Sequence, residues 1–249
     1  MESIVRNALG KSASTDDSLQ NRFKLESTSG ATFSNVDYYK LAEQEFGFSV
    51  KRAKVTVIGC GGAGQNAVTR LTEMGVEGAT TISANTDAKH LAVGKADKKI
   101  LIGRELTRGL GAGGIPEVGK KAAEESRNEI KEALDGSDLV FAVAGLGKGT
   151  GSGSIPVACE IAKSMGAIVI AVATMPFKLE GARISKAEEA LASLRQVCDT
   201  AIVIENDKLL KFAGNMSIQN AFAVADELIA SMVKGITETI TLPSLVNLD

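Results

Sequence analysis

From residue 54 onward, hydrophobic positions form short apolar runs separated by longer stretches in which apolar and polar residues mix. Short apolar runs bounded by turn residues indicate buried strands, and apolar residues recurring at helical spacing indicate helices. Strands are expected at 55–58, 80–84, 100–102, 138–144, 167–173 and 201–204. Helices are expected at about 67–74, 116–134, 154–165, 184–196 and 217–240.

This alternation predicts an α/β fold. A mostly parallel, doubly wound sheet with helices on both faces is expected, ending in a long central helix. Ligands of such sheets bind at the carboxyl ends of the strands. Residues 51–240 are predicted to form this domain. Residues 1–50 are expected to form an N-terminal extension that is partly disordered. A helix is expected near 34–46, either packed on the domain or contacting a partner, and the sequence does not decide which.

Composition and charge narrow the function classes. The chain has 249 residues, 44% of them hydrophobic, and a net charge of −2. A dedicated nucleic-acid binder would carry a basic patch, so no nucleic-acid partner is expected. No apolar run approaches the roughly 20 residues that span a bilayer, so no membrane insertion is expected. The N-terminus lacks a secretory pattern, and a cytoplasmic location is the default.

The cysteines and the single histidine do not indicate a disulfide framework or a metal site. The three cysteines are odd in number and far apart, which fits neither a disulfide framework nor a zinc site. His90 is the only histidine, and it is interpreted as an ordinary helix residue. No protein metal site is predicted.

Glycine is concentrated in three stretches, at 59–64, 109–114 and 145–153. In the last of them every second residue is glycine, between an apolar strand and a helix with Ser154 near its N-terminus. Strand, glycine loop and helix N-terminus form a phosphate site, because unpaired N–H groups and the helix dipole favour anions. A flexible linker is the alternative, but linkers are not bounded by a buried strand and an apolar helix.

The stretch 59–64 reads G-x-G-x-x-G and follows a strand. With Asp87 further along as a ribose acceptor, it also suits a nicotinamide-dependent dehydrogenase. Two further glycine stretches are not needed by such an enzyme. The segment 114–121 is nearly a Walker P-loop, but Lys121 cannot supply the hydroxyl that binds magnesium.

Several segments together resemble the tubulin/FtsZ superfamily of GTPases. Gly147-Lys-Gly-Thr-Gly-Ser-Gly153 is similar to its GGGTGSG signature. Other matching segments are the NTDA of 85–88, the GLGAGGIPEVG of 109–119, the PFKLEGAR of 176–183 and the NDKLL of 206–210. The resemblance covers about residues 54–249 and implies a Rossmann-like GTPase domain.

The resemblance also implies site residues, which are carried over here only by their motifs. Those expected to bind nucleotide are Gly61, Gly62, Ala63, Gly64, Asn66, Asn85, Asp87, Ala112, Gly113, Gly147, Lys148, Gly149, Thr150, Gly151, Ser152, Gly153, Glu180, Arg183, Asn206, Phe222 and Asp226. Asn206 would bond guanine, Phe222 would stack on the base, and Asp226 would accept from two guanine donors. A carboxylate that accepts from the guanine N1–H and N2 amino group selects guanine over adenine, because adenine offers no such pair of donors.

Two positions depart from the family pattern. Lys148 stands where relatives usually carry glycine, and its ammonium should favour the more highly charged nucleotide. One residue separates Gly181 from Arg183, where bacterial relatives usually have two. Arg183 could therefore be a nucleotide contact or half of a surface ion pair.

The segment 241–249 resembles the start of the family's catalytic loop, with Asn247 and Asp249 as the implied catalytic residues. The resemblance implies GTP and GDP as ligands, Mg²⁺ as a cofactor, and head-to-tail self-association into protofilaments of a division ring. GTP would then be hydrolysed between subunits. A nucleotide-binding paralogue that does not hydrolyse GTP remains an alternative, beside the dehydrogenase.

Overall fold

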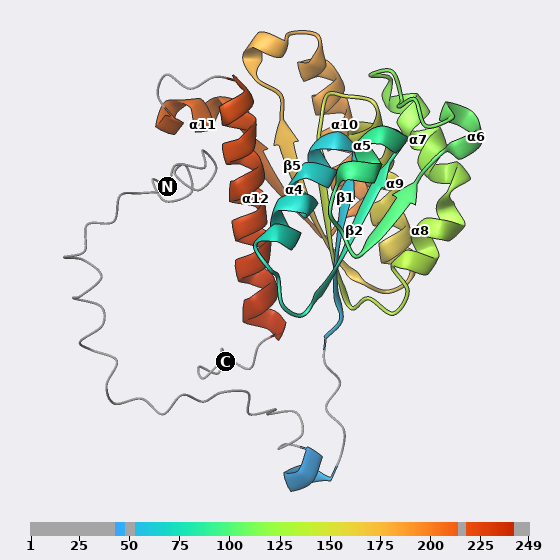
Figure 1. Ribbon diagram of the computed structural model, residues 1–249, viewed down its shortest axis with the longest axis vertical. Coiled ribbons are helices and arrows are strands. Elements are labelled where there is room, and N and C mark those ends of the chain that lie inside the picture. The colour runs from blue at the N-terminus through green and yellow to red at the C-terminus, as the bar shows by residue number, and fades with distance from the viewer. Residues whose placement is uncertain (1–42, 48–52, 214–217, 242–249) are drawn as a thin grey trace, which may run out of the picture.

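The computed structural model describes residues 43–47, 53–213 and 218–241 (Figure 1). Residues 43–46 are helical, and the remainder of the helix predicted at 34–46 lies outside the described residues. The strands and helices below carry the labels of Figure 1. Within the described ranges, no helix is long and apolar enough to cross a membrane.

Six parallel strands form one sheet in the order β3-β2-β1-β4-β5-β6. Their bounds are β1 Val55–Cys60, β2 Ala79–Asn85, β3 Lys98–Leu101, β4 Leu139–Gly145, β5 Ile168–Met175 and β6 Thr200–Glu205. The central strands β1 and β4 are almost continuously buried because helices cover both of their faces. The predicted doubly wound parallel sheet is confirmed.

The order in which strands join the sheet reverses between β1 and β4, which remain parallel. These strands pair in register from Val55 opposite Leu139 to Cys60 opposite Ala144. The chain moves outward to β2 and β3 on one side of this pair, and to β5 and β6 on the other. Such a switch point leaves a crevice beyond the carboxyl ends of the two strands, where ligands bind.

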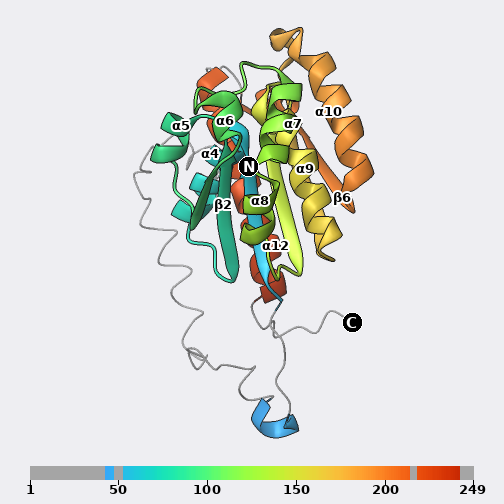
Figure 2. The same ribbon diagram turned by 90° about the vertical axis from the view of Figure 1, so that its right-hand side faces the viewer.

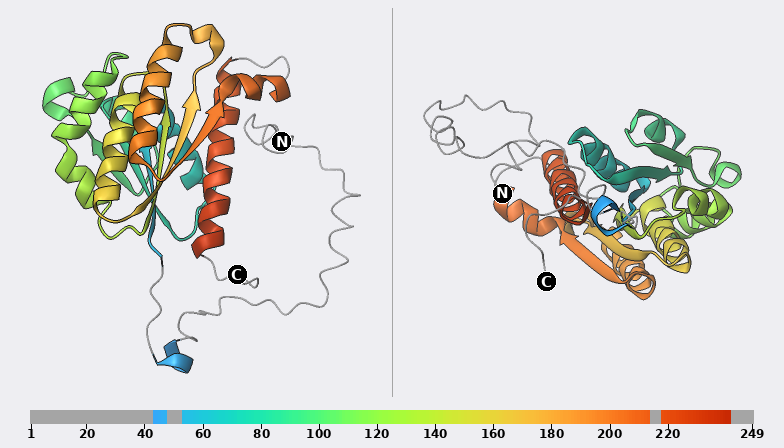
Figure 3. Two further views of the ribbon diagram at one scale, coloured as in Figure 1. Left: turned by 180° about the vertical axis from the view of Figure 1, so that it is seen from behind. Right: turned by 90° about the horizontal axis from the view of Figure 1, so that it is seen from below.

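Helices lie on both sides of the sheet. One side carries α7 Pro116–Glu125, α8 Arg127–Ala133, α9 Thr150–Ser164 and α10 Arg183–Val197. The other carries α4 Gly61–Glu73 and the long α12 Ile218–Thr241. Figure 2 shows α9 and α10 across the sheet from α4 and α5 (Ala88–Val93). From behind, α12 stands apart from α7, α8 and α9 (Figure 3).

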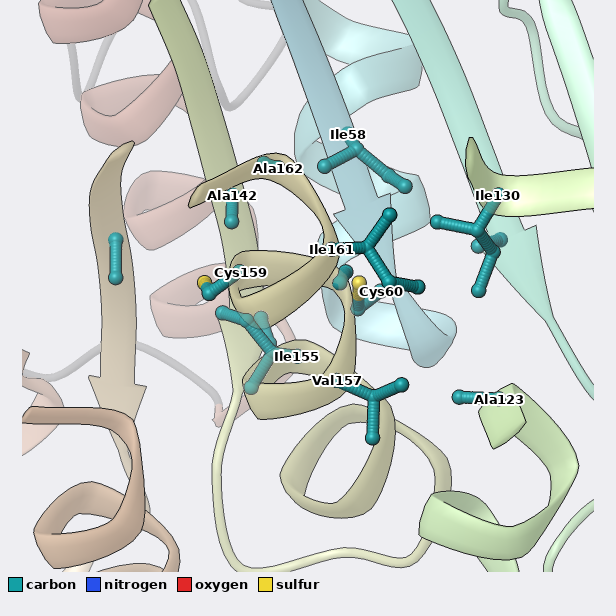
Figure 4. Close-up of a cluster of buried hydrophobic side chains, with 14 of the residues drawn as sticks. Ile58, Cys60, Ala123, Ile130, Ala142, Ile155, Val157, Cys159, Ile161 and Ala162 are labelled. Atoms are coloured by element: carbon teal, nitrogen blue, oxygen red, sulfur yellow. The ribbon is translucent and has the colours of Figure 1, made fainter. Parts of the chain in front are cut away.

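The larger core lies under α9. Figure 4 shows Ile155, Cys159 and Ile161 of this helix gathered with Ile58 and Cys60 of β1. All three cysteines are buried free thiols, and burial raises the pKa of Cys60 to about 12. The three cysteines are therefore part of the buried interior.

Two predicted helices differ from the structure. The single helix expected at 116–134 is broken at Ser126, which separates α7 from α8. The Ser126 hydroxyl is buried and accepts a hydrogen bond from the Gly103 backbone N–H (3.1 Å), so this turn joins α7 to the segment after β3. The helix expected to start near Ser154 begins at Thr150 instead, inside the glycine stretch.

Candidate nucleotide site

A cavity of about 680 Å³ opens beyond the carboxyl ends of β1 and β4. Sixteen predicted site residues line it: Gly62, Ala63, Asn66, Asn85, Asp87, Gly113, Gly147, Lys148, Gly149, Thr150, Gly151, Glu180, Arg183, Asn206, Phe222 and Asp226. The other predicted binders, Gly61, Gly64, Ala112, Ser152 and Gly153, are not among the lining residues. Asn247 and Asp249 lie outside the described residues.

Two helix N-termini point at one end of this cavity. β1 passes directly into α4 at Gly61, and β4 reaches α9 after a loop of four residues, 146–149. Gly62 and Ala63 of α4 and Thr150 and Gly151 of α9 line the cavity. Unpaired N–H groups and two helix dipoles converge there, which suits a phosphate chain.

The glycines of 145–153 also bring backbones close together, a role that the sequence alone did not show. A Cβ on Gly153 would lie 2.0 Å from the Pro116 carbonyl oxygen, and one on Gly151 would lie 2.8 Å from the Gly145 carbonyl oxygen. Close packing of α9 on α7 and on β4 requires these glycines.

Gly147 has a different role in this loop. Its φ of +90° is a left-handed conformation that favours glycine. The Gly147 N–H donates to the Ser152 hydroxyl at 2.8 Å. Ser152 therefore holds the loop in place rather than lining the cavity.

The loop between α6 (Arg104–Thr107) and α7 forms another wall. It follows a helix rather than a strand. Leu110 forms an isolated bridge with Asp87, and the Gly111 N–H donates to the Thr86 carbonyl at 3.1 Å. Ala112 is buried against Gly149, so it supports the wall rather than facing a ligand.

A polar network of four side chains lies under the wall made by α4 and β2. Asn85 Nδ2 donates to Gln65 Oε1 at 2.9 Å, and both side chains are buried. His90 Nε2 lies 3.0 Å from Asn66 Oδ1. His90 also lines the cavity, which corrects its interpretation as an ordinary helix residue.

The Asp87 side chain forms the N-cap of α5. Its carboxylate accepts from the His90 backbone N–H at 2.9 Å and caps α5. Asp87 also lines the cavity. The cap bond leaves its second carboxylate oxygen able to accept from a ligand, so this contact does not separate a GTPase from a dehydrogenase.

The opposite end of the cavity suits a purine base. Asn206, at the start of α11 (Asn206–Ala213), is 2% exposed, and its Oδ1 has no hydrogen-bond partner among the described residues. The ring of Phe222 meets that of Phe177 edge to face at 5.1 Å. Burial raises the pKa of the Asp226 carboxyl group to about 7. A ligand with hydrogen-bond donors would satisfy both polar groups.

Three charged side chains lie at the rim. Arg183 pairs with Glu180, whose carboxylate also accepts from the Phe177 backbone N–H at 3.0 Å. Both residues nevertheless line the cavity. Lys148 extends over the Phe222 ring, with Nζ 6.0 Å from its centroid.

Sequence reasoning missed one cation that lines the cavity, three residues after Arg183 on the same helix. Lys186 of α10 lines the cavity and donates from Nζ to the Gly114 carbonyl at 3.1 Å. This bond joins α10 to the loop before α7. No motif pointed to Lys186, because its role depends on how two distant segments meet.

Comparison with known proteins places these features in context. Residues 54–214 match the model of the tubulin/FtsZ family, GTPase domain. The chain is 56% identical over 216 residues to cell division protein FtsZ 2 of Methanocaldococcus jannaschii, covering 87% of this chain and 56% of the relative. It is 56% identical over 199 residues to FtsZ of Methanothermobacter thermautotrophicus, covering 80% and 52%.

Solved structures give the same result. An empty FtsZ dimer of M. jannaschii superposes with a TM-score of 0.79 at 51% identity, covering 87% of this chain and 62% of that one. A GTPγS-bound protofilament of CetZ2 from Haloferax volcanii superposes with a TM-score of 0.70 at 26% identity, covering 78% and 60%. The chain thus spans a little over half the length of its relatives.

Proposed function

This chain belongs to the tubulin/FtsZ family of GTPases, and we propose that its cavity binds GTP and GDP with the guanine between Asn206 and Asp226. The observation that carries the proposal is the chemical difference between the two ends of the cavity. Two helix N-termini face one end, and a buried unpaired Asn206 oxygen and a desolvated Asp226 carboxyl face the other.

The chemistry of each end matches one part of the nucleotide. Phosphate oxygens would accept from the N-terminal N–H groups of α4 and α9. Guanine N1–H and its exocyclic amino group would both donate to Asp226, whereas adenine offers no such pair. The Phe222 ring would stack on the base. Glu180 would accept from ribose hydroxyls, and Arg183 is placed to turn from Glu180 toward the nucleotide.

We expect Mg²⁺ to be held mainly by phosphate oxygens and water. Among the described residues no group of three His, Cys, Asp or Glu side chains could form a dedicated site. The Thr150 hydroxyl, 2.6 Å from that of Thr86, is an oxygen of this chain at the phosphate end. A magnesium ion bound there would neutralise charge on the phosphates.

The whole protein is proposed to act as a polymerising GTPase of the cytoplasm. Head-to-tail contacts are heterologous and produce open filaments. Asn247 and Asp249 are proposed to reach the nucleotide of the neighbouring subunit, where a carboxylate would orient the attacking water. The CetZ2 relative was solved as a protofilament with GTPγS, which supports this assembly.

Calorimetry with GDP, ADP and NADH tests the binding proposal. We expect saturable GDP binding with adenine nucleotides far weaker. Binding of NADH in preference to GDP would instead support the dehydrogenase and contradict our proposal. Phosphate release from GTP in the presence of magnesium separates a GTPase from a paralogue that only binds.

A further inference from the structure

The guanine end of the cavity depends on α12, a helix outside the sheet. Phe222 and Asp226 come from this helix, whereas the phosphate end comes from α4, α9 and the loop before α7. Recognition of one nucleotide by both ends therefore requires α12 to hold a fixed rotation and height beside α4. Figure 1 shows the two helices side by side on the same face of the sheet.

Apolar packing holds α12 against α4 and the sheet. Ile229, Ala230 and Val233 of α12 pack with Val68 and Leu71 of α4 and with strand residues. Such contacts are non-directional. On its outer side Asp226 borders a second cavity of about 280 Å³, also lined by Asn66, Thr69, Arg70, Glu73 and Ala223. Asp226 therefore lies between two cavities, and its carboxyl group is buried without close packing on those two sides.

Directional contact comes from the next residue. Glu227 is 2% exposed, and its carboxylate pairs with the Arg70 guanidinium of α4. Glu227 adjoins Asp226, and Arg70 lies one helical turn after Asn66, which lines the nucleotide cavity. A buried carboxylate needs such a partner, because an unpaired buried charge is costly.

The pair is anchored further on its α4 side. Arg70 also lies 3.8 Å from Glu73, and Glu73 pairs with Lys95 at 2.8 Å. The chain of charges runs from the segment before β3, through α4, to α12. These contacts hold the Arg70 side chain beside Glu227 and link the segment before β3 to α12.

We propose that the Arg70–Glu227 ion pair positions the Asp226 carboxylate and so determines the preference for guanine. Glu227 and Arg70 are positioning residues, since neither is expected to touch the nucleotide. The inference rests on the proposed binding of guanine by Asp226.

The test compares GDP with IDP, which lacks the exocyclic amino group that Asp226 would accept from. Dissociation constants are measured by calorimetry for the wild type, Glu227→Gln, Arg70→Met and the double variant Arg70→Met/Glu227→Met. The double variant keeps the fold, because apolar residues often replace a buried ion pair without loss of stability. We expect the GDP/IDP preference to fall about tenfold in the single and double variants, the size of one lost charge-assisted hydrogen bond.

Lys234→Met is the matched control. Its ammonium donates to the Met74 and Gly75 carbonyls at 2.8 and 2.9 Å and joins the same two helices, two turns from Asp226. We expect this variant to be less stable but to keep the wild-type preference. Wild-type preference in the double variant, or an equal loss of preference in Lys234→Met, would overturn the inference. A wild type that does not prefer GDP to IDP would contradict the proposed function itself.

Discussion

Burial raises the pKa of the Asp226 carboxyl group to about 7, far above its value in an unfolded chain. Between about pH 4 and pH 7 the folded protein keeps this proton and the unfolded chain loses it. The free energy of unfolding therefore falls as pH rises through that window. A substitution that removes the carboxyl group should remove this fall.

We expect ligand-free Asp226→Asn to exceed the wild type in stability by up to about 4 kcal/mol at pH 8, with the difference vanishing near pH 4. The carboxyl pKa rises from about 4 to about 7, and each tenfold change in a protonation equilibrium corresponds to about 1.4 kcal/mol. Urea denaturation at both pH values measures it. The same variant should bind GDP about 1–3 kcal/mol more weakly. Equal stability at pH 8 would mean that the carboxylate is solvated in the folded state.

Lys148 raises a separate question at the scale of one residue. The sequence places its ammonium beside the phosphates, which predicts a greater loss for GTP than for GDP on substitution. The structure places Nζ 6.0 Å from the Phe222 centroid, at the base end. From there its charge acts similarly on both nucleotides.

We therefore expect Lys148→Met to change GTP and GDP affinity by similar factors. Calorimetry at low salt measures both, with Lys131→Met on α8 as a control for the change in net charge. A selective loss of GTP affinity would contradict this expectation and would indicate that the Lys148 ammonium acts on the phosphates.

At the scale of elements, the contact between α7 and α9 depends on Gly153. Its Cβ would meet the Pro116 carbonyl oxygen at 2.0 Å and the Lys120 backbone nitrogen at 2.4 Å. Both are backbone atoms that cannot yield without separating the helices. We expect Gly153→Ala to destabilise the protein by at least about 1–3 kcal/mol, as overpacking of a tight contact does.

Gly235 provides the matched control for this prediction. It lies inside α12, and a Cβ there would meet nothing within 4 Å. Gly235→Ala should stabilise the fold by about 0.5–1 kcal/mol, because glycine is unfavourable inside a helix. Thermal denaturation of both variants should show opposite shifts. A tolerated Gly153→Ala would mean that α7 moves freely relative to α9.

The elements also show where sequence reasoning succeeded and where it stopped. Apolar runs predicted all six strands. In β1 and β4 the signal is strong because both faces are buried. The edge strands β3 and β6 are partly exposed, and only part of each is apolar. The break at Ser126 was missed because its cause is a hydrogen bond to Gly103, a distant residue. Helical pattern alone cannot show such a contact.

The candidate site divides in the same way. Motif residues such as Asn206 and Asp226 were found because they sit at fixed spacings from recognisable segments. Lys186 and the Arg70–Glu227 pair were not, because each depends on two segments meeting in space. Gly153 was predicted to bind the nucleotide, but the need for glycine at this position is explained by the close packing of α9 on α7.

At the scale of the whole molecule, the cavity is lined by residues from many segments of the chain, between Gly62 of α4 and Asp226 of α12. A nucleotide that spans both ends would add a bridge between α12 and the N-termini of α4 and α9. Ligand that binds only the folded state stabilises it by about 2.7 kcal/mol at a hundred times its dissociation constant.

We expect the stabilisation by bound nucleotide to differ from one element to another. Hydrogen exchange with saturating GDP should slow in α12, whose base-binding end is fixed by the ligand, more than in β1, which is already buried on both faces. ADP at the same concentration serves as the control and should protect α12 little, since adenine cannot donate to Asp226 as guanine does. Protection by GDP confined to the N-termini of α4 and α9 would show that the phosphates bind without the base reaching α12. The proposed orientation of the nucleotide would then have to be abandoned, while phosphate binding at the switch point of the sheet would stand.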